Sequence, residues 1–132
     1  MASKFKIRVF GKTGCDKCKV LNQRIDSLLE KPEWTDFQKE YFDVETEEGL
    51  VNFAQAECLN PQRIPAFVVA RVNEESGRTE PLLNPDPGAM DELCKKTRLY
   101  TWLGLQTDYS ETGRGVISSS MITAILDEAR RV

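Results

Sequence analysis

The sequence has no histidine in its 132 residues. This absence excludes Cys-His and Ser-His nucleophilic pairs and every zinc site that mixes cysteine with histidine. If a cysteine is activated in this chain, the cause must be a lysine, an arginine, a helix terminus or burial. The absence of histidine therefore limits the catalytic and metal sites that this chain can form.

Long hydrophobic runs are also missing. The longest apolar stretch, residues 64–72 (IPAFVVARV), contains an arginine and is too short to cross a bilayer. Residues 1–10 alternate charged and apolar side chains, whereas a signal peptide would be continuously apolar at its centre. We therefore expect a soluble, cytoplasmic protein with no membrane partner.

An excess of positive charge is absent as well, since the net charge is −3 and the isoelectric point is about 5.1. Six acidic residues and no basic residue lie from Glu40 to Glu57. A phosphate-binding surface needs clustered lysine and arginine side chains. Nucleic acid is therefore not an expected partner.

The first half of the sequence contains short periodic segments. Residues 4–10 alternate apolar and basic side chains, which predicts a strand with one polar face. Helical spacing of apolar residues then predicts a helix that ends at Pro32, with the buried face Cys18, Leu21, Ile25 and Leu28. Residues 39–44 predict a second strand. A second helix is expected to bury Leu50, Val51, Ala54 and Cys58.

The second half begins with a buried type of strand at residues 66–72. Residues 78–83 predict a weaker returning strand at a sheet edge, because Pro81 has no N–H for a ladder. A third helix is expected at residues 89–96, and residues 99–110 are left unassigned. After the serines at 118–120 a final helix is expected, with the apolar side Met121, Ile122, Ile125, Leu126 and Ala129.

The order of these segments predicts an α/β protein of one compact domain. Strands that alternate with helices favour a parallel pair, and the hairpin of residues 66–83 adds an antiparallel edge. The final helix is expected to pack over the sheet of its own domain. The alternative is that its apolar side forms an interface with a second copy or with a client protein.

Two cysteines, Cys15 and Cys18, stand three residues apart at the expected start of the first helix. At this spacing their sulfur atoms can approach bonding distance, and the first sulfur lies where unpaired backbone N–H groups point outward. The helix dipole and the nearby lysines, Lys12, Lys17 and Lys19, should lower the pKa of Cys15, against the opposing charge of Asp16. Cys15 would then attack a disulfide, and the shielded Cys18 would resolve the mixed disulfide.

Two other interpretations of this cysteine pair remain open. A structural zinc site would need four thiolates, so both Cys58 and Cys94 would have to converge on it. The pair could also be inert packing. We prefer redox chemistry because the pair follows a predicted strand and opens a helix. Cys58 is interpreted as a small apolar residue of a helix face, and Cys94 as a structural residue of the same kind or, alternatively, a regulatory thiol.

A proline at the entrance to the buried strand is the second indication of function. A cis peptide bond between Ile64 and Pro65 would expose backbone groups at the strand's edge, and an extended thiol substrate could pair with them. The alternative is a proline that merely starts a strand.

Taken together, the first strand, VFGKTGCDKCKVL, YFDVET, the second helix and RIPAFVVA resemble the thioredoxin fold. The resemblance covers residues 4–96 and is strongest to glutaredoxins and the small glutaredoxin-like thioredoxins. It implies a βαβαββα order with a mixed four-stranded sheet flanked by helices, Cys15 as nucleophile and Cys18 as resolving cysteine. The cis-proline of the family falls on Pro65 after Ile64, and Lys12 stands at the spacing of the lysine that contacts glutathione.

The sequence also departs from these families. The Pro-Tyr pair between the glutaredoxin cysteines is replaced by Asp16 and Lys17. The Gly-Gly-acid motif that holds glutathione is replaced by LLNPDPGAMDEL, with Gly88 alone. The tryptophan that precedes the first thioredoxin cysteine is replaced by Gly14. The resemblance therefore lies between the two groups.

These observations predict a thiol-disulfide oxidoreductase that reduces or exchanges protein or small-molecule disulfides. We expect residues 1–96 to form the thioredoxin-like domain and residues 97–132 a helical extension packed on it. The expected partners are a disulfide-containing protein or a small thiol, with no bound cofactor, glutathione as an optional co-substrate, and a monomer or weak dimer. The alternative function is a non-enzymatic adaptor or metal-binding module, whose cysteines hold a metal or a static disulfide.

Overall fold

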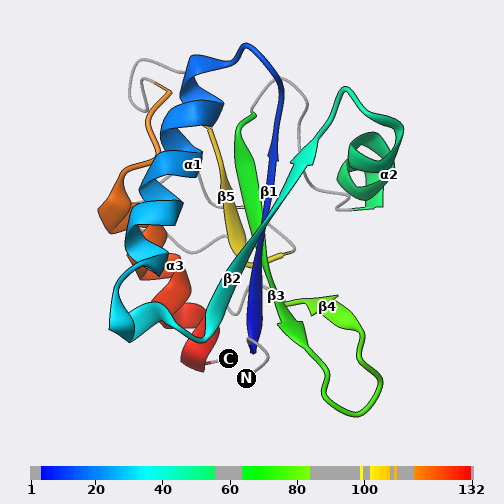
Figure 1. Cartoon of the computed structure of the whole chain (residues 1–132), viewed down its shortest axis with the longest axis vertical. Coiled ribbons are helices and arrows are strands. Elements are labelled where there is room, and N and C mark those ends of the chain that lie inside the picture. The colour runs from blue at the N-terminus through cyan, green and yellow to red at the C-terminus, as the bar shows by residue number, and fades with distance from the viewer. Residues whose placement is uncertain are drawn as a thin grey trace.

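The computed structural model describes residues 4–55, 64–83, 99, 102–107, 109 and 115–131. The helix expected at residues 89–96 and the cysteines Cys58 and Cys94 lie outside these residues. The elements are β1 (Phe5–Gly11), α1 (Asp16–Leu29), a 3-10 turn (Pro32–Trp34), β2 (Phe37–Asp43), α2 (Glu47–Gln55), β3 (Ala66–Val72), β4 (Thr79–Pro81), β5 (Gly104–Gln106) and α3 (Ser119–Arg131) (Figure 1).

The sheet has the strand order β2-β1-β3-β4, with β1 and β2 parallel and the other pairs antiparallel. The short strand β5 also pairs with β3, at residues 66–68, while β4 pairs with residues 70–72. Because β1 occupies one side of β3, both short strands share its other side. The expected sheet of four strands therefore has a fifth, formed by residues that were left unassigned.

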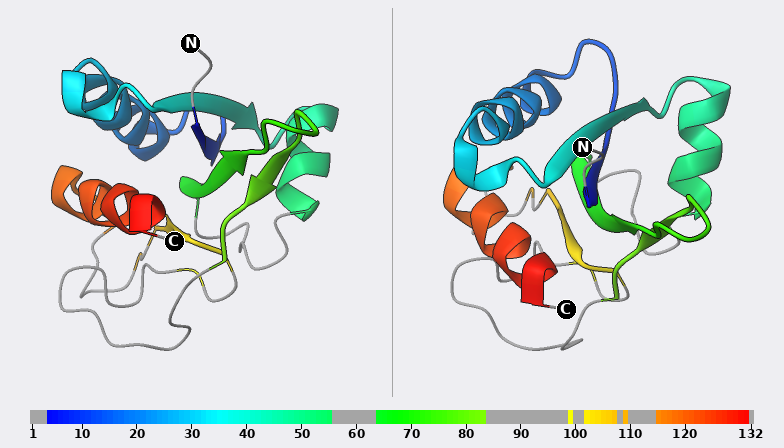
Figure 2. Two further views of the ribbon diagram at one scale, coloured as in Figure 1. Left: turned by 90° about the horizontal axis from the view of Figure 1, so that it is seen from below. Right: turned by 60° about the horizontal axis from the view of Figure 1, so that its bottom comes forward.

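Helices cover both faces of this sheet, with α1 and α3 side by side on one face and α2 on the other (Figure 2). The larger core lies under α1 and α3, where Ile7, Ile25 and Leu126 are all fully buried. Every residue predicted for the buried side of α3 is buried: Met121, Ile122, Ile125, Leu126 and Ala129. The prediction that this helix packs against its own sheet and core agrees with these contacts.

The orientation of α2 differs from the prediction. Leu50 and Val51 are 56% and 51% exposed, and Gly49 and Phe53 face the sheet instead. Gly49 approaches strand β2 so closely that a Cβ atom on it would lie 1.7 Å from the carbonyl oxygen of Asp43. Residues four apart share a helix face, so contact through Gly49 places Phe53 inward. The predicted face of Leu50, Val51 and Ala54 was wrong because a glycine gives no apolar signal.

The strand order, the helices that follow β1 and β2 on opposite faces, and the β3–β4 hairpin are those of the thioredoxin-like fold. The expected fold class is confirmed by this topology. Among the described residues, no helix is both long enough and apolar enough to span a membrane.

Candidate active site

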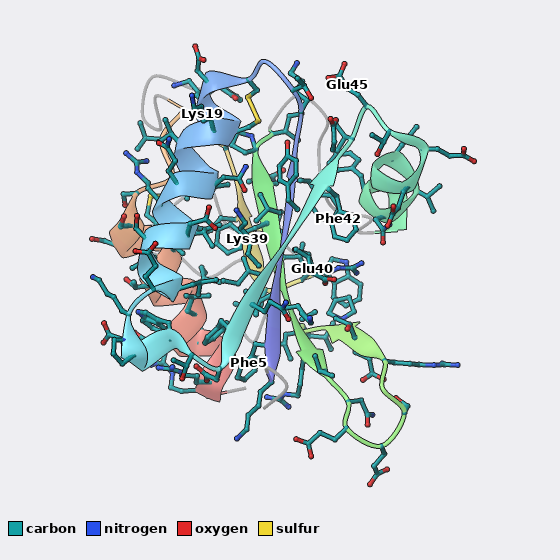
Figure 3. The ribbon with its side chains drawn as sticks, in the orientation of Figure 1. Phe5, Lys19, Lys39, Glu40, Phe42 and Glu45 are labelled. Atoms are coloured by element: carbon teal, nitrogen blue, oxygen red, sulfur yellow. A yellow bond between two sulfur atoms is a disulfide. The ribbon has the colours of Figure 1, made fainter. Side chains whose placement is uncertain are left out.

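Cys15 and Cys18 form a disulfide at the start of α1, visible as a yellow bond in Figure 3. Their Cα atoms are 5.2 Å apart, within the normal range for a disulfide. The loop of residues 12–15 carries the chain from the end of β1 to this point. The predicted pairing of the two sulfurs is therefore confirmed.

Cys15 is the N-cap residue of α1. Its Sγ accepts a hydrogen bond from the backbone N–H of Cys18 at 3.2 Å, and its carbonyl accepts one from Lys19 N–H at 3.1 Å. A sulfur in this position faces the positive end of the helix dipole, which favours the thiolate over the thiol. Asp16, in the first turn, acts in the opposite direction. The low pKa expected for reduced Cys15 stays a prediction.

The two sulfur-bearing residues differ in access. Cys15 is half-buried at the loop, whereas Cys18 is 2% exposed and lies on the core side of α1 with Leu21 and Ile25. A substrate approaching from outside therefore meets Cys15 first. This asymmetry matches the division into an attacking and a resolving cysteine.

Gly11 and Tyr41 pack around the buried cysteine. A Cβ atom on Gly11 would lie 3.1 Å from Cys18 Cβ, 3.2 Å from Cys18 Sγ and 3.0 Å from the hydroxyl of Tyr41. The absence of a side chain on Gly11 therefore leaves room for the disulfide against the sheet. Neither residue was predicted, because their proximity to Cys18 depends on strand register and not on spacing in the chain.

Hydrogen bonds fix the loop before Cys15 to the end of β2. The hydroxyl of Thr13 donates to Asp43 Oδ2 at 3.0 Å, and the N–H of Val44 donates to the Gly11 carbonyl at 2.9 Å. The other carboxylate oxygen of Asp43 accepts from the N–H of Glu45 at 2.9 Å. The loop that presents Cys15 is thus held from a neighbouring strand.

The Ile64–Pro65 peptide bond is cis, and both residues are buried. The Pro65 carbonyl accepts hydrogen bonds from the N–H and the hydroxyl of Thr107, at 3.2 and 2.6 Å. The Ile64 carbonyl accepts one from the hydroxyl of Tyr109 at 2.5 Å. The expectation that this backbone is open to a substrate is wrong for both carbonyls, because the segment after β5 already donates to them.

A cleft of about 100 Å³ lies between α1, Pro65 and the segment that leads into α3. Two exposed valines, Val20 and Val116, give it an apolar lining. Lys17 and Arg24 add positive charge, and Arg24 Nη1 also donates to the Ile117 carbonyl at 2.8 Å. Pro65 thus belongs to a cleft beside the helix that carries both cysteines.

The other predicted substrate residues lie elsewhere. Lys12 is exposed in the loop before Cys15 and, like Ile64, is not among the described residues that line the cleft. Arg24 was not predicted, and its only signal in the sequence is its position one turn after the buried Leu21. Over the described part of the chain, no cluster of three or more cysteine or acidic residues could hold a metal ion.

No family model and no curated protein matches the sequence. Among solved structures, the chain is similar to oxidised mitochondrial thioredoxin 3 from Saccharomyces cerevisiae, with 17% identity and a TM-score of 0.41. The match covers 58% of this chain and 62% of that one, so it spans less than two thirds of the yeast protein. By its own strand order and the order of its helices, this chain has a thioredoxin-like fold, with a cis-proline before β3 and a disulfide at the start of α1.

Proposed function

We propose that this chain is a thiol-disulfide oxidoreductase whose cysteines alternate between a dithiol and a disulfide. The observation that carries the proposal is the Cys15–Cys18 disulfide at the N-terminus of α1, with a backbone N–H directed at the Cys15 sulfur. A hydrogen bond and a helix dipole at that sulfur stabilise its ionised form, which is the reactive nucleophile.

The reaction begins from the reduced chain. The Cys15 thiolate attacks one sulfur of a substrate disulfide, a new bond joins Cys15 to that sulfur, and the other substrate sulfur leaves as a thiolate. Cys18 then loses its proton and attacks Cys15 Sγ, which forms the observed disulfide and releases the second substrate thiolate. Two electrons pass to the substrate, both released thiolates take protons from solvent, and an external thiol reductant restores the dithiol.

The cleft supports a substrate with an apolar segment next to its disulfide. Val20, Val116 and Pro65 offer apolar contact, and Lys17 and Arg24 favour acidic groups on the substrate. We assign substrate contacts to Pro65, to the adjacent Ile64 and to Lys12 in the exposed loop. A disulfide-containing protein or a small thiol fits this description, without a bound cofactor and with glutathione as an optional co-substrate.

The dithiol form of the chain is maintained in a reducing compartment, and we therefore propose a cytoplasmic location. A reducing compartment such as the cytoplasm keeps the pair ready to attack. Both cysteines come from one chain, so we propose that the protein acts as a monomer or a weak dimer.

The test is reduction of a model protein disulfide with dithiothreitol as electron donor. Cys15→Ser should abolish turnover, and Cys18→Ser should accumulate a mixed disulfide that mass spectrometry detects as a covalent adduct. Cys94→Ser is the control and should keep wild-type turnover. Turnover by Cys15→Ser at the wild-type rate, or a Cys15–Cys18 disulfide that dithiothreitol does not reduce, would contradict the proposal and favour the adaptor with a static disulfide.

A further inference from the structure

Tyr41 lies on the face of β2 that is turned toward α1. Side chains alternate along a strand, and Phe37 and Lys39 share the face of Tyr41. Phe37 belongs to the core under α1 and α3, and Lys39 Nζ is 2.7 Å from Asp26 Oδ1 on α1. Figure 3 shows Lys39 on the α1 side of β2 and Phe42 on the α2 side. Tyr41 therefore continues a row of side chains that leads to the start of α1.

The end of this row is the buried cysteine. Strand register pairs Tyr41 with Val9 and Asp43 with Gly11. The Tyr41 hydroxyl and Cys18 Sγ lie 3.0 and 3.2 Å from the point where a Cβ atom of Gly11 would stand. No side chain from Gly11 separates them, and the two atoms are no further apart than the sum of these two distances. A bridge of one water, or rotation of the two side chains, can span such a separation with hydrogen bonds.

Cys18 needs such a donor because it must react as a thiolate from a buried position. It is 2% exposed, so little water can solvate a negative charge on its sulfur. The backbone N–H of Cys18 donates to the Cys15 sulfur and not to the sulfur of Cys18. The hydroxyl of Tyr41 makes no hydrogen bond to the described residues in this disulfide form, so it is available when the disulfide opens.

We propose that Tyr41 donates a hydrogen bond to the Cys18 thiolate and thereby accelerates the resolving step. This role rests on the proposed oxidoreductase function. The Cys18 thiolate attacks Cys15 Sγ, the bond from Cys15 to the substrate sulfur breaks, and the substrate leaves with the electron pair. The proton that Cys18 released passes through solvent to that leaving thiolate, and Tyr41 keeps its own proton throughout.

The surroundings of Tyr41 favour a hydroxyl that donates a hydrogen bond over a phenolate that acts as a base. Tyr41 is 41% exposed, and the partial burial of its phenol, followed by the carboxylates of Asp43 and Glu45, raises its pKa above the usual value near 10. The hydroxyl therefore stays protonated at neutral pH. Other charged residues stand on the elements around Cys18, and they are Lys12, Asp16, Lys17, Lys19, Asp43 and Glu45. Replacement of Tyr41 by phenylalanine leaves all of them in place.

The test separates the two chemical steps with one equivalent of a small aromatic disulfide that releases a coloured thiolate. In stopped flow, attack by Cys15 releases the first thiolate and resolution by Cys18 releases the second. The Cys15→Ser variant gives the background from the three remaining cysteines, Cys18, Cys58 and Cys94. Tyr41→Phe should leave the first phase unchanged and slow the second about tenfold near neutral pH, because hydrogen bonds to charged groups are strong. Raising the pH should restore much of the second phase.

The matched control is Lys39→Met, on the same face of β2, which should change neither phase. An unchanged second phase in Tyr41→Phe would overturn the role of Tyr41, and so would an equal loss in both phases at every pH. Absence of both phases in the wild type would instead overturn the proposed function. Wild-type NMR gives a measurement without a variant: the phenol of Tyr41 should titrate at higher pH in the reduced protein than in the oxidised protein.

Discussion

The hydroxyl of Tyr109 donates a hydrogen bond of 2.5 Å to the backbone carbonyl of Ile64. Strand β5 brings these residues together, since Gln106 at its end pairs with Ala66 at the start of β3. The carbonyl beside Pro65 is thus occupied by the chain itself, at the border of the cleft that we assign to substrate.

Tyr109→Phe should open this carbonyl to an extended substrate. A peptide N–H from the substrate could then pair with Ile64, as in strand addition to a sheet edge. We expect KM for a polypeptide disulfide to fall about threefold, the size of one net hydrogen bond, with kcat unchanged. A small aromatic disulfide, which has no peptide N–H, should show no change. An equal effect on both substrates would indicate a general loosening of the site and contradict this prediction.

Stability should depend on pH through the pair of Asp36 and Arg130. Hydrogen bonds from Arg130 Nε and Nη2, at 3.1 and 2.6 Å, lower the pKa of Asp36. A carboxyl whose pKa is depressed by folding stabilises the protein above its ordinary pKa of 3.8, and this stabilisation is lost as pH falls further. Because the pair is about one third exposed, we expect it to contribute about 1 kcal/mol.

The measurement is urea unfolding of the wild type and of Asp36→Asn at about pH 6 and about pH 3. The variant should be less stable than the wild type at the higher pH, and the difference should shrink at the lower pH. A difference that is equal at both values would show that the ion pair is not its cause.

Gly49→Ala should be strongly destabilising. The new Cβ would lie 1.7 Å from the backbone oxygen of Asp43, so α2 must move away from β2. We expect a loss of about 3 kcal/mol in the free energy of unfolding. The control is Gly77→Ala, at φ +71° with no atom within 4 Å of the new Cβ, which should cost about 1 kcal/mol from backbone strain alone. Equal losses in the two variants, measured by urea unfolding, would contradict the close packing of α2.

The C-terminal helix α3 should be required for folding. Leu126 is fully buried in the core shared with β1 and α1, so Leu126→Ala should lower the free energy of unfolding by about 2–5 kcal/mol. Leu83→Ala, at a 61% exposed position, should cost less than about 0.5 kcal/mol. Deletion of residues 116–132 should abolish cooperative unfolding. A truncated chain that folds but changes its oligomeric state would instead assign α3 to an interface.

Much of the fold could be predicted because the spacing of apolar residues within a segment shows which of its residues are buried. Buried residues alternate over Phe5 to Val9 in β1, and in α1 and α3 they recur at helical spacing, so each segment carries its own signal. Strand β5 has no such signal. It is short and depends on Gly104, where a Cβ atom would lie 2.1 Å from the Phe67 carbonyl oxygen. Strand β5 forms because it pairs with β3, and the residues of β5 alone do not indicate this pairing.

The same distinction applies to the candidate site. The cysteine pair could be found because both the spacing and the helix start lie within a few residues of the chain. Tyr41, Arg24 and Tyr109 reach the site through strand register or helix packing, so their contribution depends on tertiary structure. A cysteine pair at a helix start can therefore be predicted from the sequence more readily than the groups that surround it.

The cap on α1 also provides a way to watch the reaction. Because the Cys18 amide proton is bonded to the Cys15 sulfur, its magnetic environment follows the electron density on that atom. In an isotope-labelled sample, one peptide resonance would move as the sulfur becomes thiolate, mixed disulfide and internal disulfide in turn. The proposed catalytic cycle could then be followed in real time with an unlabelled, colourless disulfide.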